Sequence, residues 1–212
     1  YPERAKVRGC KSPACIHTGQ IRRAMEALKQ AERPVFLLGG GVIISRAGEE
    51  MRCLAETTGV PVVTTIMGKG SIPTSHPLYI GNLGIHGAYA ANMAVSRCDL
   101  LFSIGTRFND RITGRTDCFA PGASIVHVDI DPSSISRNIS VDIPIVADAG
   151  QAIRAFTERA CPLEIGEWRE QIGQWKKQHP IERKKKGMTP ETICLLYTSP
   201  SPRDNERPRM PS

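Results

Sequence analysis

Two loops of this sequence carry residue types that bind phosphate and nucleotide groups. The first, residues 81–87, holds three glycines and the imidazole of His86. The second, residues 105–111, follows the apolar run 100–104, which predicts a buried strand. A glycine at a strand end lets backbone approach a ligand closely, and Arg107 offers a planar fork of donors to a phosphate. Because ligands of open α/β sheets lie beyond the carboxyl ends of the strands, the two loops predict a site for a nucleotide-like ligand.

Other strand ends repeat this pattern. Gly39, Gly40 and Gly41 follow the apolar run 35–38, and a strand–glycine–helix layout directs backbone N–H groups at an anion. The triplet is neither a GxGxxG fingerprint nor a P-loop, so a plain tight turn and a ligand cradle both stay open. Small or acidic residues end each predicted strand: Gly39, Thr65, Gly105, Asp129 and Asp148. This repetition favours a ligand site more than any single loop does.

The order of elements predicts the fold that positions these loops. Strand-like apolar runs stand at 35–38, 61–65, 100–104, 124–130 and 143–147. Helical periodicity stands at 19–31, 45–57, 88–97, 149–160 and 168–179. We expect Thr18 to cap the first helix, Met93 to point inward and residues 71–79 to be irregular. The alternation predicts an α/β fold, a doubly wound, mostly parallel, Rossmann-like sheet of about six strands with helices on both faces.

The composition narrows the class of protein. With 212 residues, 40% of them hydrophobic, the chain can form one full domain with a core and extensions. Aromatic residues make up only 5%, which disfavours a nucleic-acid binder that stacks bases. The net charge is +7, and much of it lies after residue 182. We favour a solvated run there over a contact with nucleic acid or anionic lipid.

The cysteines and the apolar runs indicate the compartment. The seven cysteines form no CxxC pair and no ligand pattern with histidine, so we expect free thiols in a reducing cytoplasm and no metal site. The sequence has no signal peptide and no apolar run of about 20 residues, so we expect no membrane span. The chain begins at Tyr1 rather than Met, which suggests a piece of a longer protein.

Five segments together resemble the central domain of the acetolactate synthase (acetohydroxyacid synthase) large-subunit family of thiamine-diphosphate enzymes. They are LGGGV at 38–42, TTIMGKG at 64–70, GIHG at 84–87, GTRFNDR at 105–111 and HVDIDP at 127–132. The resemblance extends over residues 1–190. The sequence departs from it at Ile85, Thr106 and Asn109, where the family usually has Met, Ala and Asp.

The resemblance implies an enzyme that condenses two pyruvates to 2-acetolactate with loss of CO₂, or accepts 2-oxobutanoate, in branched-chain amino-acid biosynthesis. Thiamine diphosphate and Mg²⁺ would bind to other domains and FAD to this one. A homo-oligomer with a regulatory small subunit is implied. The implied FAD-binding residues are Gly39, Gly40, Gly41, Thr65, Ile66, Ile85, His86, Gly87, Gly105, Thr106, Arg107, Asn109, Asp129, Ile130, Asp148 and Ala149. Arg111 would lie nearest the substrate channel, and His86 has the alternative of capping a backbone carbonyl.

The sequence and the resemblance together predict how the chain is organised into a domain, linkers and a tail. We expect an interdomain linker at 1–18, the central FAD-binding-type domain at 19–162, and a helix and linker toward a C-terminal domain at 163–192. Residues 193–212 are rich in Pro, Ser and Arg and are expected to be a non-native disordered tail, with a true regulatory tail as the alternative. The family's catalytic glutamate and its Gly-Asp-Gly signature belong to other domains. We therefore expect no catalytic residue and no metal ligand here, and an isolated chain that is inactive.

Two other interpretations stay open. Another thiamine-diphosphate enzyme, such as pyruvate oxidase or glyoxylate carboligase, would share the fold, although segments 64–70 and 105–111 favour the synthase. A stand-alone nucleotide- or flavin-binding module, like a sirtuin or an electron-transfer flavoprotein domain, would also bind a ligand at these strand ends. A sirtuin needs a four-cysteine zinc cluster, which the spacing of these cysteines does not provide.

Overall fold

The computed structural model describes residues 16–181. Contacts within the chain divide it into two units, Tyr1–His179 and Pro180–Ser212. The first unit holds every helix and strand described below. The expected tail at 193–212 and nearly all of the expected linker at 1–18 lie outside the described residues, and the division into domains stays a prediction.

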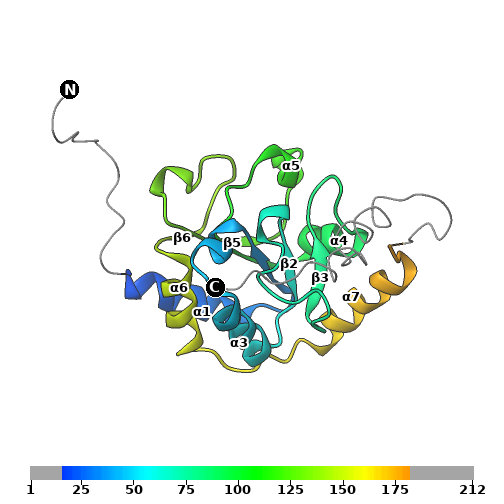
Figure 1. Cartoon of the computed structure of the whole chain (residues 1–212), viewed down its shortest axis with the longest axis horizontal. Helices are drawn as coiled ribbons and strands as arrows, with labels where there is room; N and C mark the ends of the chain where they lie inside the picture. The colour runs from blue at the N-terminus through cyan, green and yellow to red at the C-terminus, as the bar shows by residue number, and fades with distance from the viewer. Residues whose placement is uncertain (1–15, 182–212) are drawn as a thin grey trace, which may run out of the picture. The chain divides into compact units, whose positions relative to one another are not determined.

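Six strands form one parallel sheet (Figure 1). They are β1 (Pro34–Leu38), β2 (Val62–Thr64), β3 (Tyr79–Asn82), β4 (Leu100–Ile104), β5 (Ser124–Asp129) and β6 (Ile143–Val146). Their order is β3-β2-β1-β4-β5-β6, and every neighbouring pair is parallel. The direction of strand addition reverses between β1 and β4, and such a switch point is where open sheets bind ligands. The expected doubly wound sheet is confirmed.

β1 and β4 form the centre of this sheet. All residues of both strands are buried, as expected for strands covered on both faces. The ring of Phe102 in β4 meets Phe36 of β1 and Phe156 of α6 (Ala149–Thr157) edge to face, at centroid distances of 5.5 and 4.9 Å. Edge-to-face contact is a favoured geometry for aromatic rings. The three rings therefore fix the two central strands whose ends carry the glycine turns.

Helices cover both faces of the sheet. Besides α6 they are α1 (Thr18–Gln30), α2 (Gly40–Ile44), α3 (Gly48–Thr58), α4 (Tyr89–Arg97), α5 (Asp110–Thr113) and α7 (Gly166–Gln178), with 3-10 turns η1 (Ile66–Gly68), η2 (Thr116–Cys118) and η3 (Pro132–Ser134). α3 packs on α6, and α4 packs on α7. Because crossovers between parallel strands are right-handed, α3 and α4, which lead in opposite directions across the sheet, lie on opposite faces (Figure 1). Within residues 16–181, no helix is long and apolar enough to cross a bilayer.

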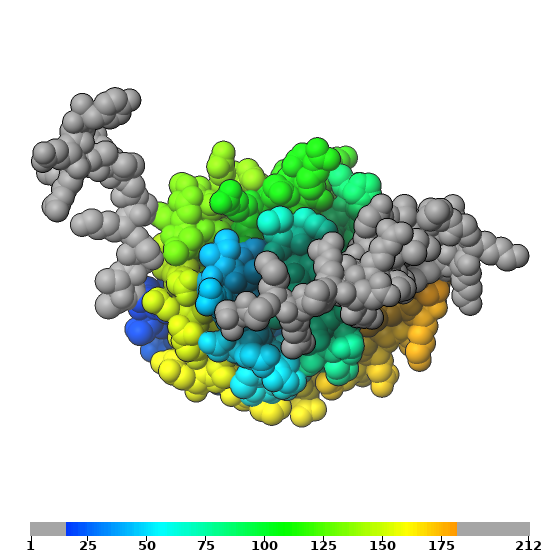
Figure 2. All heavy atoms as spheres, in the orientation of Figure 1, coloured from blue at the N-terminus to red at the C-terminus, as the bar shows by residue number. Residues whose placement is uncertain are grey.

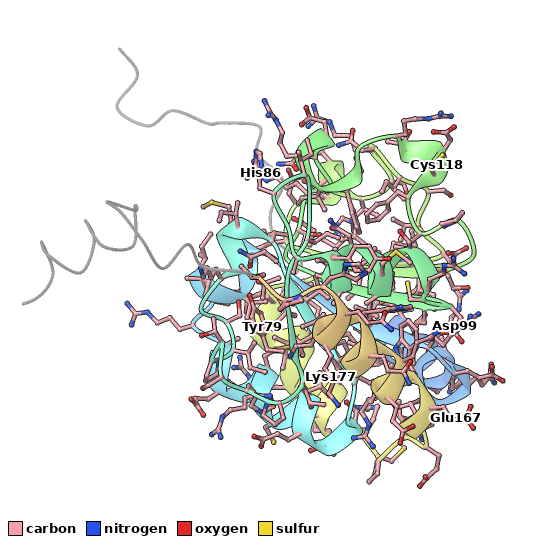
Figure 3. All side chains as sticks on the ribbon, turned by 90° about the vertical axis from the view of Figure 1, so that its right-hand side faces the viewer. Tyr79, His86, Asp99, Cys118, Glu167 and Lys177 are labelled. Carbon is pink, nitrogen blue, oxygen red and sulfur yellow. The ribbon has the colours of Figure 1, made fainter. Side chains whose placement is uncertain are left out.

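Two carboxylates accept backbone hydrogen bonds at the amino edge of the sheet and so connect neighbouring segments there. Asp99, just before β4, accepts hydrogen bonds from the backbone N–H groups of Glu32 (2.7 Å) and Arg33 (2.9 Å). Asp142, just before β6, accepts one from the N–H of Ile125 at 2.7 Å. Figure 3 shows Asp99 in the lower part of the view and His86, from the loop after β3, near the top. The amino edge is thus used for internal bonds, and the opposite edge carries the long loops.

The structure differs from the expected elements at β3 and at α2. β3 lies where we expected irregular chain and the start of a glycine loop, because its residues Tyr-Ile-Gly-Asn form no apolar run. The helix expected at 45–57 is α3, which begins three residues later, at Gly48, and ends at Thr58; the short helix α2, which ends at Ile44, was not expected. Arg46 between them has a φ of 53°, a left-handed conformation that a continuous helix does not contain.

Two single-residue expectations were also wrong. The N-cap of α1 is His17, whose Nδ1 accepts from the N–H of Gln20 at 3.3 Å, whereas Thr18 is the first helical residue. Met93 is only half-buried. α4 packs on the domain through small residues instead, including the buried Ala91 and Ala94.

Candidate functional site

A cavity opens at the carboxyl edge of the sheet. Its volume of about 770 Å³ falls within the usual range of roughly 300–1,000 Å³ for small-molecule sites. The turns after all six strands contribute to its wall. In Figure 2 the light-blue residues after β1, the cyan residues after β2 and the green residues after β4 lie around this region. The cavity therefore lies where the topology predicts a ligand site.

The turns after β1 and β4 pack directly on each other at the floor of this cavity. Gly39 donates its N–H to the carbonyl of Ile104 (2.9 Å), and Gly41 donates to that of Gly105 (3.1 Å). Gly105 has a φ of 65°, and a Cβ there would stand 2.7 Å from the Cα of Gly41. Packing between the two turns therefore requires glycine, with or without a ligand. Gly40 and Gly41 line the cavity, whereas Gly39 lies behind its wall against Gly105.

Large apolar side chains surround the opening. Five cavity residues are large hydrophobic residues that are more than half exposed: Ile44, Ile66, Met67, Ile85 and Ile130. They follow four different strands, so the rim is apolar on several sides. Exposed apolar groups gathered around one opening indicate a ligand with an apolar part or a covering protein surface.

Opposite charges stand at the β4–β5 side. Asp129 ends β5, and its Oδ1 accepts the N–H of Asp131 at 2.8 Å, which leaves Oδ2 with lone pairs for a further donor. Arg107 is exposed on the turn after β4. Hydrogen bonds from Ser133 lower the pKa of Asp131, and the charge of Arg107 lowers it further. A carboxylate oxygen and a guanidinium thus suit a ribose hydroxyl and a phosphate.

His127 lies beneath this side and received no role from the sequence. Its side chain is fully buried, and its Nε2 lies 2.7 Å from the carbonyl oxygen of Thr106. A carbonyl oxygen only accepts, so Nε2 carries the proton. Burial lowers the pKa of His127, against smaller opposing effects of the Thr106 hydrogen bond and the charge of Asp129. The imidazole therefore favours its neutral form and donates to the backbone of the turn after β4.

Asp148 holds the wall on the far side. Its Oδ2 accepts from the hydroxyl of Ser45 at 2.6 Å. Its Oδ1 accepts from the N–H of Gln151 at 3.1 Å and so caps α6. Asp148 and Ala149 both line the cavity. The carboxylate is engaged in internal bonds, so its contribution to a ligand site is to shape the wall.

Asn82, at the end of β3, is a polar cavity residue of the predicted loop 81–87 to which we gave no individual role. Its Oδ1 accepts from the hydroxyl of Thr64 (2.7 Å) and from that of Tyr79 (3.1 Å). The two hydroxyls orient the amide. Nearby, the hydroxyl of Thr65 accepts from the N–H of Gly68 at 3.1 Å and caps η1.

The loop after β3 is held to α4 by a side chain. Asn92 accepts from the N–H of Gly84 (3.0 Å) and donates to its carbonyl (3.1 Å). His86 and Arg111 are exposed residues of the cavity wall. Gly87 does not line the cavity. A Cβ there would overlap the backbone of Asn82 and Gly84. Its glycine serves the packing of the loop.

Most residues predicted for the site do line this cavity. They are Gly40, Gly41, Thr65, Ile66, Ile85, His86, Gly105, Thr106, Arg107, Asn109, Arg111, Asp129, Ile130, Asp148 and Ala149. The cavity residues that we did not name individually are Ile44, Ser45, Met67, Asn82, Leu83, Gly84, Ile112, Val128 and Ala147, of which Asn82, Leu83 and Gly84 belong to the predicted loop 81–87. Most of these lie within a few residues of a predicted position, so widening each strand-end motif would have included them. Contact of any of them with a cofactor stays a prediction.

The cysteines of the described part of the chain are free thiols: Cys53, Cys98, Cys118 and Cys161. Burial, together with the charge of Asp99, raises the pKa of Cys98 to about 12, so this thiol stays protonated. Among residues 16–181, no group of three or more His, Cys, Asp or Glu is placed to hold a metal ion.

One family and several relatives match this chain. The family described as "Thiamine pyrophosphate enzyme, central domain" matches residues 21–156. A probable acetolactate synthase large subunit of Methanocaldococcus jannaschii is 49% identical over 182 residues, which cover 84% of this chain and 31% of that protein. The acetolactate synthase large subunit of Buchnera aphidicola subsp. Schizaphis graminum is 42% identical over 190 residues, covering 88% and 33%. The acetolactate synthase of Mycobacterium avium is 41% identical over 187 residues, covering 85% and 30%. The chain thus spans about a third of the length of these relatives.

Proposed function

The chain belongs to the thiamine pyrophosphate enzyme central-domain family, and we propose that it forms the FAD-binding central domain of an acetolactate synthase large subunit. The whole enzyme would condense two pyruvates to 2-acetolactate with loss of CO₂, or use 2-oxobutanoate as acceptor, in branched-chain amino-acid biosynthesis. Thiamine diphosphate, with Mg²⁺, would supply the carbanion chemistry on other domains. The names of the relatives support this reaction.

The cavity at the carboxyl edge is the observation that carries the FAD assignment. Its charged β4–β5 side, with Arg107 and Asp129, and its apolar rim suit the two ends of a flavin dinucleotide. Gly40 is the first residue of α2, so its N–H has no partner within the helix, and with Arg107 it would face the diphosphate. The available oxygen of Asp129 would accept from a ribose hydroxyl. Ile66 and Ile85 would cover the isoalloxazine ring.

The chain would contribute binding and orientation, and no step of the reaction. Its turns would fix the flavin against a rigid sheet, and the apolar rim would exclude water from one side of the ring. We further propose a homo-oligomer and a regulatory small subunit as partners of the whole enzyme, supported by the large-subunit names of the relatives. A cytoplasmic location is proposed on the same ground.

Replacement of Arg107 by alanine tests the assignment of the diphosphate. Loss of a charge-assisted hydrogen bond to a phosphate should weaken FAD binding roughly tenfold or more. The measurement is titration of the full chain with FAD by isothermal calorimetry. Arg97→Ala is the matched control, because Arg97 is also exposed but ends α4 beside the start of β4, at the other edge of the sheet. Equal affinity of the two variants would remove Arg107 from the site.

A further inference from the structure

We propose that His127 is a positioning residue that holds the turn after β4 in its ligand-binding form and makes ligand binding in the cavity depend on protonation. The inference rests on the proposed function, because FAD is the ligand that reports it. His127 itself does not line the cavity. It acts through the backbone of Thr106.

The turn at residues 105–109 needs such support. It supplies Gly105, Thr106, Arg107 and Asn109 to the cavity wall, and Phe108 within it has a φ of 47°, which is an unfavourable conformation for a bulky residue. A strained turn persists only where its surroundings hold it. Here the neighbouring side chains do so.

Two side-chain donors hold the carbonyls of this turn. His127 donates to the carbonyl of Thr106 at 2.7 Å, and Asn138 donates to that of Phe108 at 2.9 Å. The rings of Phe108 and His127 meet edge to face with centroids 4.8 Å apart. The hydroxyls of Ser103 and Thr106 lie 2.6 Å apart. The imidazole thus contacts both the backbone and the strained side chain of the turn.

The surroundings of His127 accommodate only its neutral form. Nδ1 is buried without a hydrogen-bond partner in the described structure. The residues beside His127 on the neighbouring strands are Ser103 and Pro144, which carry no charge. The one nearby charge in the described part of the chain is Asp129 on β5 itself, 3.9 Å from Nε2. A second proton would therefore sit on Nδ1 with no acceptor, at a high desolvation cost.

Protonation should therefore favour an open turn in which water reaches the imidazole. Burial lowers the pKa of His127 from its ordinary value of 6.5 in the closed turn. In an open turn the imidazole would titrate near that ordinary value. As the pH falls below this ordinary pKa, the population of the open form increases. The affinity of the cavity for its ligand then decreases, because part of the binding free energy is used to close the turn.

Two substitutions distinguish the effect of the hydrogen bond that His127 donates from the effect of its protonation. His127→Gln keeps an amide N–H where Nε2 stands and does not titrate, so it should bind FAD nearly as the wild-type chain does at about pH 8. His127→Phe removes the donor, and FAD binding should weaken roughly tenfold at every pH. The wild-type chain should lose several-fold in affinity between about pH 8 and pH 5.5, and both variants should lose this pH dependence.

His86 is the control, because it is a titratable residue of the cavity wall itself. His86→Gln should keep the pH dependence. If His86→Gln abolishes it while His127→Gln keeps it, the inference is overturned. It is also overturned if both His127 variants bind FAD with the wild-type affinity and pH profile. His127→Gln decides the matter where His127→Phe fails to fold.

Failure of the wild-type chain to bind FAD would contradict the proposed function, and the state of His127 can then be measured without a ligand. Nitrogen-15 spectra of the histidine side chains report the tautomer and the titration of each ring. We expect a neutral Nε2–H form of His127 that persists below its ordinary pKa of 6.5. An imidazole that titrates at its ordinary pKa of 6.5 in the folded chain overturns the inference.

Discussion

Gly105 lines the candidate site, and its backbone conformation and its close approach to Gly41 both require a glycine. Its φ is 65°, and a Cβ on this residue would stand only 2.7 Å from the Cα of Gly41, which leaves no room for a side chain. Gly105→Ala should lower the free energy of unfolding by about 2 kcal/mol or more, because it adds left-handed strain to a backbone overlap. Urea unfolding measures this loss.

The control for this substitution is Gly122→Ala. A Cβ at Gly122 would meet nothing within 4 Å, so its unfolding midpoint should match that of the wild-type chain. Equal midpoints for Gly105→Ala and Gly122→Ala would mean that the two turns are not packed as described.

Single residues at strand ends were the most predictable part of the site. Arg107 and Asp129 could be placed at the cavity because a buried strand has a recognisable end, where the topology places ligands. Gly39 and Gly87 were placed in the site but pack behind it. A glycine indicates a close approach without saying whether a ligand or another turn approaches. His127 was missed because its partner Thr106 belongs to the turn after a different strand.

Asp99 connects two elements that are distant in sequence, because it precedes β4 and bonds to the segment that precedes β1. Asp99→Ala removes the acceptor for the N–H groups of Glu32 and Arg33, so the free energy of unfolding should fall by about 1–2 kcal/mol. Chemical denaturation checks this value. Asp117→Ala is the control, because Asp117 is exposed and its only ion pair in the described structure is with Arg115, two residues away. A similar loss for both variants would contradict the tie at the amino edge.

Long apolar runs in the sequence predicted the central strands correctly, whereas short segments of mixed polarity did not predict the elements that they form. β1 and β4 are buried throughout, and their sequence shows it. β3 is short and contains glycine and asparagine. It is stabilised by pairing with β2 and by the hydroxyl bonds to Asn82, which depend on residues distant in sequence. The break between α2 and α3 likewise depends on the left-handed backbone of Arg46.

For the molecule as a whole, alternation of strands and helices predicted a doubly wound sheet. The same pattern does not specify which strands become neighbours, because alternation is compatible with several strand orders. The observed order places the turns after β1 and β4 side by side. Because these two turns are adjacent, the separate strand-end motifs line a single cavity.

The buried His127 should make the stability of the whole chain depend on pH. Its pKa is lowered in the folded state from an ordinary value of 6.5, so the unfolded chain binds a proton first as the pH falls. Stability is therefore full above that value and decreases as the pH falls through it, by at most about 1.4 kcal/mol per pH unit. Thermal unfolding between about pH 8 and pH 5 should show this decrease in the wild-type chain and a smaller one in His127→Gln. Identical pH profiles would contradict a buried neutral imidazole.

Titration of the folded chain, residues 1–212, with FAD is the direct test of whether the cavity binds a flavin. Protein and flavin fluorescence would follow binding, and circular dichroism would confirm that the chain is folded. We expect saturable binding of one FAD per chain, weakened by Arg107→Ala and not by Arg97→Ala. A folded chain that shows no saturable binding would contradict the assignment of the cavity to a flavin.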